Sequence, residues 1–181
     1  MIPFEIASIN FGIKTHEQVK HEKENKETYL AKNQAVFDKD ADYVRGWHYD
    51  SNSITLIVML SDTADMIGGE TAVKTGTGDI LKIDDYQKGW ASLVQAHCVN
   101  HIALKPYCSV ERITSVTAFR PKSSLHREPT VLTTIKPSIL PRSRYNEYYS
   151  EWMDYRLDIM ADRVNWLKSK LQKQKKEGKN F

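Results

Sequence analysis

Apolar and β-branched residues gather in short runs through the middle of the chain, and these runs have the length and composition of strands. Residues 53–60 (SITLIVML) are the clearest run, and their continuous apolar character predicts a strand buried on both faces. Glycines and other turn residues separate the runs that follow. The further predicted strands are residues 70–74, 79–83, 90–96, 101–104 and 112–119.

Strands that recur about every 8 to 12 residues without a helical pattern between them are typical of an antiparallel sandwich or barrel. Residues 1–11 are apolar enough for one more strand or for a buried N-terminal segment. Residues 14–40 are highly charged, which is consistent with a solvated helix or with a mobile loop. The fold class predicted here is therefore mainly β with flanking helices.

The pattern changes to a helical one near residue 144, after a proline-punctuated connector over residues 121–141. Apolar residues then recur at steps of three and four, at Trp152, Tyr155, Ile159, Met160, Val164, Leu167 and Leu171. We expect this amphipathic helix to pack on the outside of the sheet, and it could also bind a partner or form a homo-oligomer. The expected organisation is a core over residues 1–141, including an N-terminal segment over residues 1–42, and a helical extension over residues 142–181.

Composition limits the cellular environment and the kinds of partner that we expect for this protein. A chain of 181 residues with a net charge of +3 and no basic stripe does not favour nucleic acid. No apolar run has the roughly 18 residues of a membrane span, and the first residues lack a basic secretory signal. Two cysteines do not make a disulfide framework. We therefore expect a reduced, cytoplasmic protein that contacts neither membrane nor nucleic acid.

A candidate metal site begins with His48 and Asp50, which lie two residues apart just before the strongest predicted strand. Residues i and i+2 of an extended chain share a face, so both side chains can bind one ion. His101 begins a later strand that can return to this neighbourhood in a rolled antiparallel sheet. Two histidines and one carboxylate leave three coordination positions open, as in the sites of Fe(II) oxygenases. The sequence therefore predicts a single non-haem Fe(II) site.

A rival interpretation uses His97, Cys98, His101 and Cys108 as a zinc site. The spacing matches no tight Cys-x2-Cys knuckle, and thiolates beside Fe(II) would invite oxidation. Cys98 and Cys108 are better interpreted as small apolar fillers of the interior. His97 is better interpreted as a polar residue at a strand end.

Arg112 and Thr114 lie at i and i+2 in the last predicted strand, so both point to the same face. An arginine aimed into a barrel requires an anion, because burying an unpaired charge is costly. That anion is either an internal acid of the protein or a bound carboxylate. The planar guanidinium suits a carboxylate held by two hydrogen bonds, with the threonine hydroxyl adding a third.

The order of these motifs resembles that of the Fe(II)/2-oxoglutarate-dependent dioxygenases, in particular a fungal branch. The resemblance covers residues 43–121 and rests on HYD (48–50), GGET (68–71), GWASLVQ (89–95), HIA (101–103) and ERITSVTAFRP (111–121). It implies a double-stranded β-helix (jelly-roll) fold with His48, Asp50 and His101 as the iron ligands. It also implies that Arg112, assisted by Thr114, holds the distal carboxylate of 2-oxoglutarate.

The resemblance further implies oxidation of a small organic substrate by O2, with release of succinate and CO2 and with ascorbate supporting turnover. Enzymes of this kind usually carry a longer N-terminal region than the 42 residues before the motifs. Residues 1–11 could supply a missing strand, the chain could be truncated, or a partner subunit could complete the pocket. The alternative is a catalytically inactive jelly-roll relative that acts as a binding module or partner subunit.

Several other residues are weaker candidates. Trp47, Tyr49, Trp90 and Gln95 could line the substrate pocket, although a core position is the simpler interpretation of each tryptophan. His126, in the connector, could act as a lid over the site. Gly68-Gly69 is interpreted as a turn before a strand rather than a phosphate loop, because no helix follows. His16 and His21 are expected at the surface.

Overall fold

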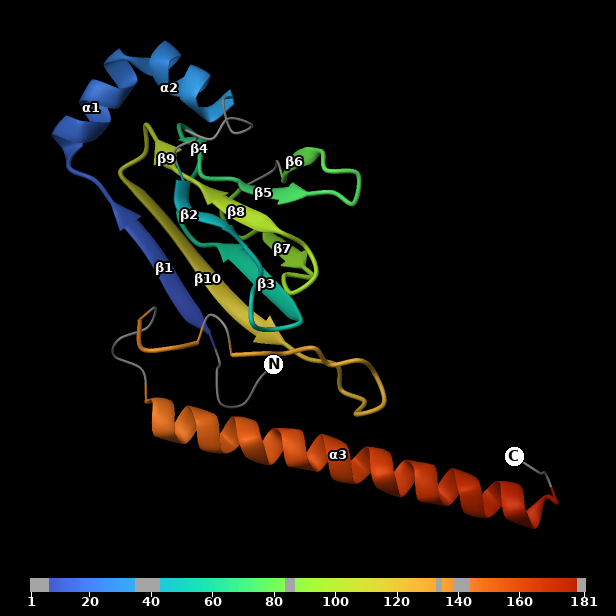
Figure 1. The fold of residues 1–181 in the computed structure, drawn as a ribbon. Helices are drawn as coiled ribbons and strands as arrows, with labels where there is room; N and C mark the ends of the chain where they lie inside the picture. Colours follow the sequence, from blue (N-terminus) through green and yellow to red (C-terminus); the bar gives the residue numbers. More distant parts are fainter. Residues whose placement is uncertain (1–6, 35–42, 84–86, 133–134, 139–143, 179–181) are drawn as a thin grey trace.

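The computed structural model describes residues 7–34, 43–83, 87–132, 135–138 and 144–178. The chain is mainly antiparallel β-sheet, with two short helices near one end of the sequence and a long helix near the other (Figure 1). The helices are α1 (His16–Glu24), α2 (Lys26–Gln34) and α3 (Tyr145–Lys176). The strands are β1 (Ser8–Ile13), β2 (Tyr43–His48), β3 (Ile54–Met59), β4 (Ile67–Gly68), β5 (Thr71–Lys74), β6 (Ile80–Ile83), β7 (Ala91–Val94), β8 (His101–Leu104), β9 (Pro106–Tyr107) and β10 (Glu111–Phe119).

Two antiparallel four-stranded sheets and one short ladder make up the β-structure. The first sheet has the order β1-β10-β3-β7, and the second has the order β2-β8-β5-β6. β4 and β9 pair only with each other, through Ile67 with Tyr107 and Gly68 with Pro106. Apart from the β5–β6 hairpin, paired strands within the two sheets are not consecutive in the chain, so the sheets depend on long-range pairing.

The strands predicted over residues 53–119 are confirmed, with ends that differ by at most two residues. β3 departs from the expected burial, because only Thr55 and Met59 of its six residues are fully buried. The expectation of a strand buried on both faces was therefore wrong. Its apolar composition reflects partial cover on each face rather than complete enclosure.

Most of the described part of the charged N-terminal region is helical, so the solvated-helix interpretation of residues 14–40 is confirmed for residues 16–24 and 26–34. Thr15 caps α1 in a reciprocal capping box with Gln18, which satisfies two backbone donors at the helix start. Before it, β1 forms the edge strand of the first sheet and pairs with β10. Residues 35–40 of the charged stretch lie outside the described residues.

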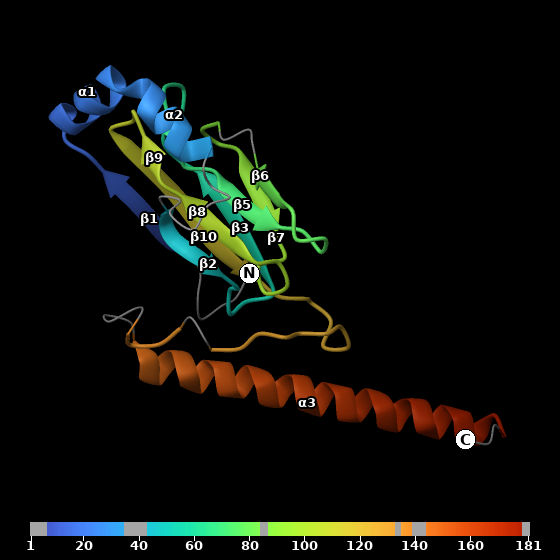
Figure 2. The ribbon, with the colours of Figure 1, turned by 45° about the horizontal axis from the view of Figure 1, so that its top comes forward.

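The helix predicted from residue 144 is present as α3, but its packing differs from the expectation. It lies along one end of the sheets, at the far end from α1 and α2, and its C-terminal half extends beyond them in both views (Figures 1 and 2). Tyr149 donates its hydroxyl to the carbonyl of Ile135 at 3.0 Å. Arg163 donates to the carbonyls of Ser124 at 2.6 Å and His126 at 2.9 Å. The helix therefore packs on the connector rather than on the sheet.

Two small apolar clusters stabilise the body. Ala72, Ile102 and Leu104 form one, with Trp47 and Ile80 packed against it. The other consists of Ile67, Tyr107 and Cys108, and Tyr29 and Leu30 of α2 cover it. Within the described part of the chain, no helix combines the length and the apolar character that crossing a membrane requires.

Candidate metal and carboxylate site

His48 and His101 face each other across the pairing of β2 and β8. They are direct partners in the register of these strands, and their ring centroids lie 4.3 Å apart. Asp50 follows β2 by two residues, and its Oδ1 lies 3.6 Å from His48 Nε2 and 3.8 Å from His101 Nε2. The predicted return of His101 to the neighbourhood of His48 is therefore confirmed. Strand pairing, rather than sequence proximity, brings the third side chain to the site.

These three side chains could hold one metal ion. Their ligand atoms all lie within 4.8 Å of one another, and within the described ranges this is the one such group of His, Cys, Asp or Glu side chains. Two ligands that are each about 2.1 Å from an ion can be at most about 4.2 Å apart. Both histidine-to-aspartate separations, 3.6 Å and 3.8 Å, fall within that limit.

Backbone carbonyls orient both imidazole rings. His48 Nδ1 lies 2.6 Å from the carbonyl oxygen of Gly46, and His101 Nδ1 lies 3.0 Å from that of Val99. A carbonyl can only accept, so each Nδ1 carries the proton and each Nε2 offers a lone pair toward Asp50. Metal-binding histidines commonly have this arrangement, in which the second ring nitrogen donates to a fixed acceptor.

Asp50 is held by groups that sequence reasoning did not identify. Thr55, which is 3% exposed, donates its hydroxyl to Asp50 Oδ2 at 2.9 Å. The backbone N–H of Asp50 donates to Ala96 at 2.9 Å, and His97 Nδ1 donates to the Asp50 carbonyl at 2.9 Å. Oδ2 therefore has a protein partner, while Oδ1 faces the two histidines.

Arg112 and Thr114 lie on the face of β10 that looks into the same cavity, as their spacing predicted. Arg112 is 8% exposed and Thr114 is 1% exposed. The Nε of Arg112 donates to the carbonyl of Gly69 at 2.9 Å, which fixes the plane of the guanidinium. Gly69 has a φ of +79°, and a Cβ there would lie 3.2 Å from Arg112 Cδ, so glycine suits this close approach.

The triad and Arg112 share one cavity of about 530 Å³ between the two sheets. Its wall takes residues from β1, β3 and β10 of the first sheet and from β2, β5 and β8 of the second. Apart from His48, Asp50, His101 and Arg112, the residues that line it are uncharged. A cavity of this size can hold a small organic molecule with few polar groups.

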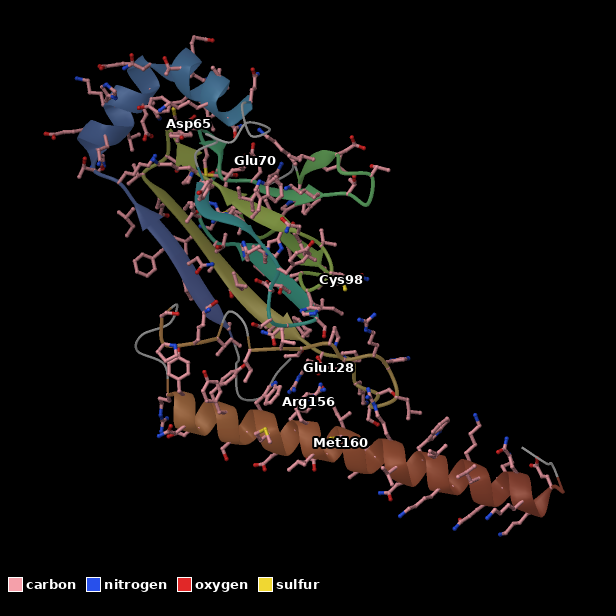
Figure 3. All side chains as sticks on the ribbon, viewed as in Figure 1. Asp65, Glu70, Cys98, Glu128, Arg156 and Met160 are labelled. Carbon is pink, nitrogen blue, oxygen red and sulfur yellow. The ribbon has the colours of Figure 1, made fainter. Side chains whose placement is uncertain are left out.

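The rival zinc residues do not come together. Cys98 is exposed in the turn before β8, whereas Cys108 is buried in the cluster with Ile67 and Tyr107 (Figure 3 labels Cys98). Burial, together with the nearby charge of Glu22, raises the pKa of the Cys108 thiol above its usual value and disfavours a thiolate. The interpretation of Cys98 as an interior filler was wrong, and that of Cys108 is confirmed.

The weaker pocket candidates lie elsewhere. Trp47 packs against the Ala72 cluster, in agreement with its core interpretation, whereas Trp90 is 54% exposed and the same interpretation of it was wrong. Tyr49 and Gln95 are exposed, and neither is among the residues that line the cavity. His126 is also exposed and lies outside the cavity wall.

Comparison with known proteins adds no relative to this description. The chain matches no protein-family model, and a search of curated proteins finds no match to it. The functional argument therefore rests on the residues of the chain and their geometry.

Proposed function

We propose that the protein is a non-haem Fe(II)- and 2-oxoglutarate-dependent dioxygenase that oxidises a small organic substrate. The observation that carries the proposal is the joint placement of two sites in one cavity. His48, Asp50 and His101 offer an incomplete ligand set, and a buried arginine lines the wall of the same cavity. A metal site alone would fit many functions, but this pair of features suits a chelating oxo acid with a second carboxylate.

The order of the strands supports a double-stranded β-helix. Apart from the two-residue strands β4 and β9, the eight strands are distributed between the sheets in the chain order first, second, first, second, second, first, second, first. Alternation between two sheets in this way, with one hairpin in the middle, is the order expected for a jelly-roll path and supports that proposal. In that path the β2–β3 corner and the start of β8 lie at the same end of the cavity, where the ligand set is found.

The residues of the cavity would have two separate roles, metal binding and 2-oxoglutarate binding. His48, Asp50 and His101 would hold Fe(II), and the fixed Nδ1 contacts keep both Nε2 lone pairs aimed at the ion. When bound, iron would supply the oxidising chemistry by which O2 and 2-oxoglutarate yield succinate, CO2 and an oxidised C–H bond. Arg112 and Thr114 would bind the distal carboxylate of 2-oxoglutarate and so set the position of its other end.

The remaining cavity wall indicates an apolar, uncharged substrate. Ile9, Phe11 and Val44 line the cavity and are 52%, 71% and 64% exposed, so they form an apolar rim between β1 and β2. Ile57 and Val116 continue this apolar character inside. The polar side of the cavity would therefore hold the metal and the oxo acid, and the apolar side would hold the substrate.

Turnover and binding measurements together test the proposal. With Fe(II), 2-oxoglutarate, O2 and ascorbate, the wild-type protein should release succinate, and His101→Ala should abolish the release. Because turnover without substrate is slow in enzymes of this type, binding provides the sharper comparison. Arg112→Ala should weaken 2-oxoglutarate binding by about tenfold to a thousandfold while metal affinity is retained.

Arg127→Ala is the matched control, because Arg127 is exposed and lies outside the cavity wall. It should bind both metal and 2-oxoglutarate as the wild type does. Equal loss of metal and 2-oxoglutarate binding in Arg112→Ala would contradict the carboxylate role and point to a folding role for Arg112.

A further inference from the structure

α3 carries an uncovered apolar stripe along its length. The stripe, called here the α3 stripe, consists of Met153, Leu157, Met160, Val164, Leu167 and Leu171. The first five of these residues are 51%, 55%, 61%, 50% and 49% exposed. Their alternating steps of four and three are the a and d positions of a heptad repeat, which is typical of a helix that pairs with another helix.

The α3 stripe is separate from the face that holds α3 on its own chain. The anchored face includes Ile159, which is 7% exposed, and Arg156, whose guanidinium bonds to Glu128. Taking about 100° per residue, the centre of the stripe lies roughly a quarter of a turn around the helix from the middle of that face. Intramolecular packing therefore leaves the stripe uncovered, and α3 extends beyond the sheets (Figures 1 and 3).

Charge is distributed unevenly along the helix, and this distribution selects the partner. The N-terminal half of α3 carries the acids Glu147, Glu151, Asp154 and Asp158. The C-terminal half carries Lys168, Lys170, Lys173, Lys175 and Lys176, with the single acid Asp162 near its start. Arg156 and Arg163, near the middle of the helix, are committed to contacts with Glu128 and the connector. A second copy aligned antiparallel would set acids against lysines, whereas a parallel copy would set like charges together.

We propose that two copies of this chain form an antiparallel dimer through the α3 stripe, with the two-fold axis between Met160 and Val164. In that register Met153 faces Leu171 of the second copy, Leu157 faces Leu167, and Met160 faces Val164. All six residues of the stripe are then paired, and none is left over at either end. Asp154 lies beside Lys168 of the second copy, on the flank of the same interface.

A membrane surface is the other setting for an amphipathic helix with a lysine-rich end. Asp154 argues against it, because it lies on the flank of the stripe and would be close to anionic lipid headgroups. The same residue is complementary to Lys168 of an antiparallel second copy.

Molar mass in solution tests the proposal. Light scattering coupled to size-exclusion chromatography of the full chain, at tens of micromolar, should give the mass of a dimer. Met160→Glu should weaken the dimer by at least about a hundredfold, because it buries charges near the axis. Leu93→Glu is the control: Leu93 is 67% exposed on β7, away from the stripe, and its variant should remain dimeric. Circular dichroism should show that both variants keep their helix content.

A charge exchange tests the orientation. Asp154→Lys and Lys168→Asp should each weaken the dimer by about fivefold, and the double variant should restore it to within about twofold. Failure of the double variant to recover would overturn the antiparallel register. A monomeric wild type, a dimer that Met160→Glu leaves intact, or a monomer that binds phosphatidylserine vesicles through the stripe would overturn the proposal itself.

Discussion

Asp50 shows how single contacts prepare the candidate metal site. Its two carboxylate oxygens have different surroundings: Oδ2 accepts the hydroxyl of Thr55, and Oδ1 faces the imidazoles of His48 and His101. The contact with Thr55 restrains rotation of the carboxylate and so keeps Oδ1 directed toward the two histidines, where an ion would bind. Residues that position a ligand in this way strengthen metal binding without touching the metal.

Thr55→Val should therefore lower metal affinity by about tenfold to a hundredfold while leaving the ligands unchanged. Valine keeps the shape of threonine but cannot donate to Asp50 Oδ2. Anaerobic titration with Fe(II) or Co(II), followed by calorimetry, would measure the effect. Thr117→Val is a suitable control, because Thr117 is on β10 but outside the cavity wall. Equal metal affinity in wild type and Thr55→Val would contradict the positioning role.

The backbone conformation of Gly69 positions Arg112, which belongs to the candidate carboxylate site. Its φ of +79° is a conformation that alanine adopts at a cost of about 1–2 kcal/mol. The added Cβ would also lie 2.9 Å from Met66 Cε and 3.2 Å from Arg112 Cδ. We expect Gly69→Ala to move the Arg112 side chain and to weaken 2-oxoglutarate binding by about tenfold, with metal affinity retained.

Gly78→Ala is the control for Gly69→Ala, because it introduces backbone strain without a contact to Arg112. Gly78 has a φ of +93°, yet nothing lies within 4 Å of the Cβ position. Gly78→Ala should lower the free energy of unfolding by about as much as the backbone strain in Gly69→Ala does, and it should leave 2-oxoglutarate affinity unchanged. If both variants weakened 2-oxoglutarate binding equally, general destabilisation would explain the result and the contact with Arg112 would not.

At the scale of elements, a buried carboxylate joins α3 to the corner that follows the metal ligands. Glu128 accepts hydrogen bonds from Ser53 at 2.9 Å, from the hydroxyl and N–H of Thr130, and from Arg156 at 2.8 Å (Figure 3). Next to it, Val131 donates its N–H to the Ser51 carbonyl at 3.0 Å. The connector and α3 therefore stabilise residues 51–53, which directly follow Asp50.

Burial alone would raise the pKa of Glu128, but the hydrogen bonds from Thr130 and Ser53 and the charge of Arg156 outweigh it. The pKa of Glu128 therefore lies below its usual value. Because the charged form is favoured in the folded state, its stabilisation is fully present above the unfolded pKa of about 4.3 and is lost as the pH falls through the lower, folded pKa.

Glu128→Gln should accordingly lower the free energy of unfolding by about 1–3 kcal/mol at neutral pH. The difference from wild type should shrink as the pH falls below the unfolded pKa of about 4.3, and it should be lost once the pH passes the lower, folded pKa, where the wild-type carboxylate is protonated. Urea unfolding between pH 3 and pH 7 would measure it. Glu151→Gln, at an exposed position of α3, should change stability by less than about 0.5 kcal/mol. A difference for Glu128→Gln that did not vary with pH would contradict the charged role.

Elements with a strong local pattern were predictable, and those that depend on distant partners were not. The apolar runs at 53–60 and 112–119 and the helical period after residue 144 each indicate one type of structure by themselves. β4 and β9 are two residues long, and Pro106 looks like a strand breaker, so no local pattern marks them. The packing of α3 was also unpredictable, because Arg156 and Arg163 anchor it together with Ile159, while the predicted stripe residues Met160, Val164 and Leu167 stay exposed.

For the molecule as a whole, the candidate site lies between two sheets and draws on both. The spacing of His48 and Asp50, and that of Arg112 and Thr114, could be identified from the sequence because side chains at i and i+2 share a face. The approach of His101 to His48 and Asp50 could be predicted from the expectation that a later strand returns to their neighbourhood. Thr55 and Gly69 could not be identified in the same way, because their roles depend on a side-chain contact and a backbone approach that only the assembled sheets create.

The central claim is that this cavity binds Fe(II) and 2-oxoglutarate together. Anaerobic addition of one equivalent of Fe(II) and then 2-oxoglutarate tests it directly, because chelation of the metal by the oxo acid gives a charge-transfer band in the visible. The account predicts that the band appears with wild type, is lost with His48→Ala, and requires more 2-oxoglutarate with Arg112→Ala. Absence of the band in wild-type protein that binds Fe(II), or one equivalent of zinc that survives His48→Ala, would contradict it.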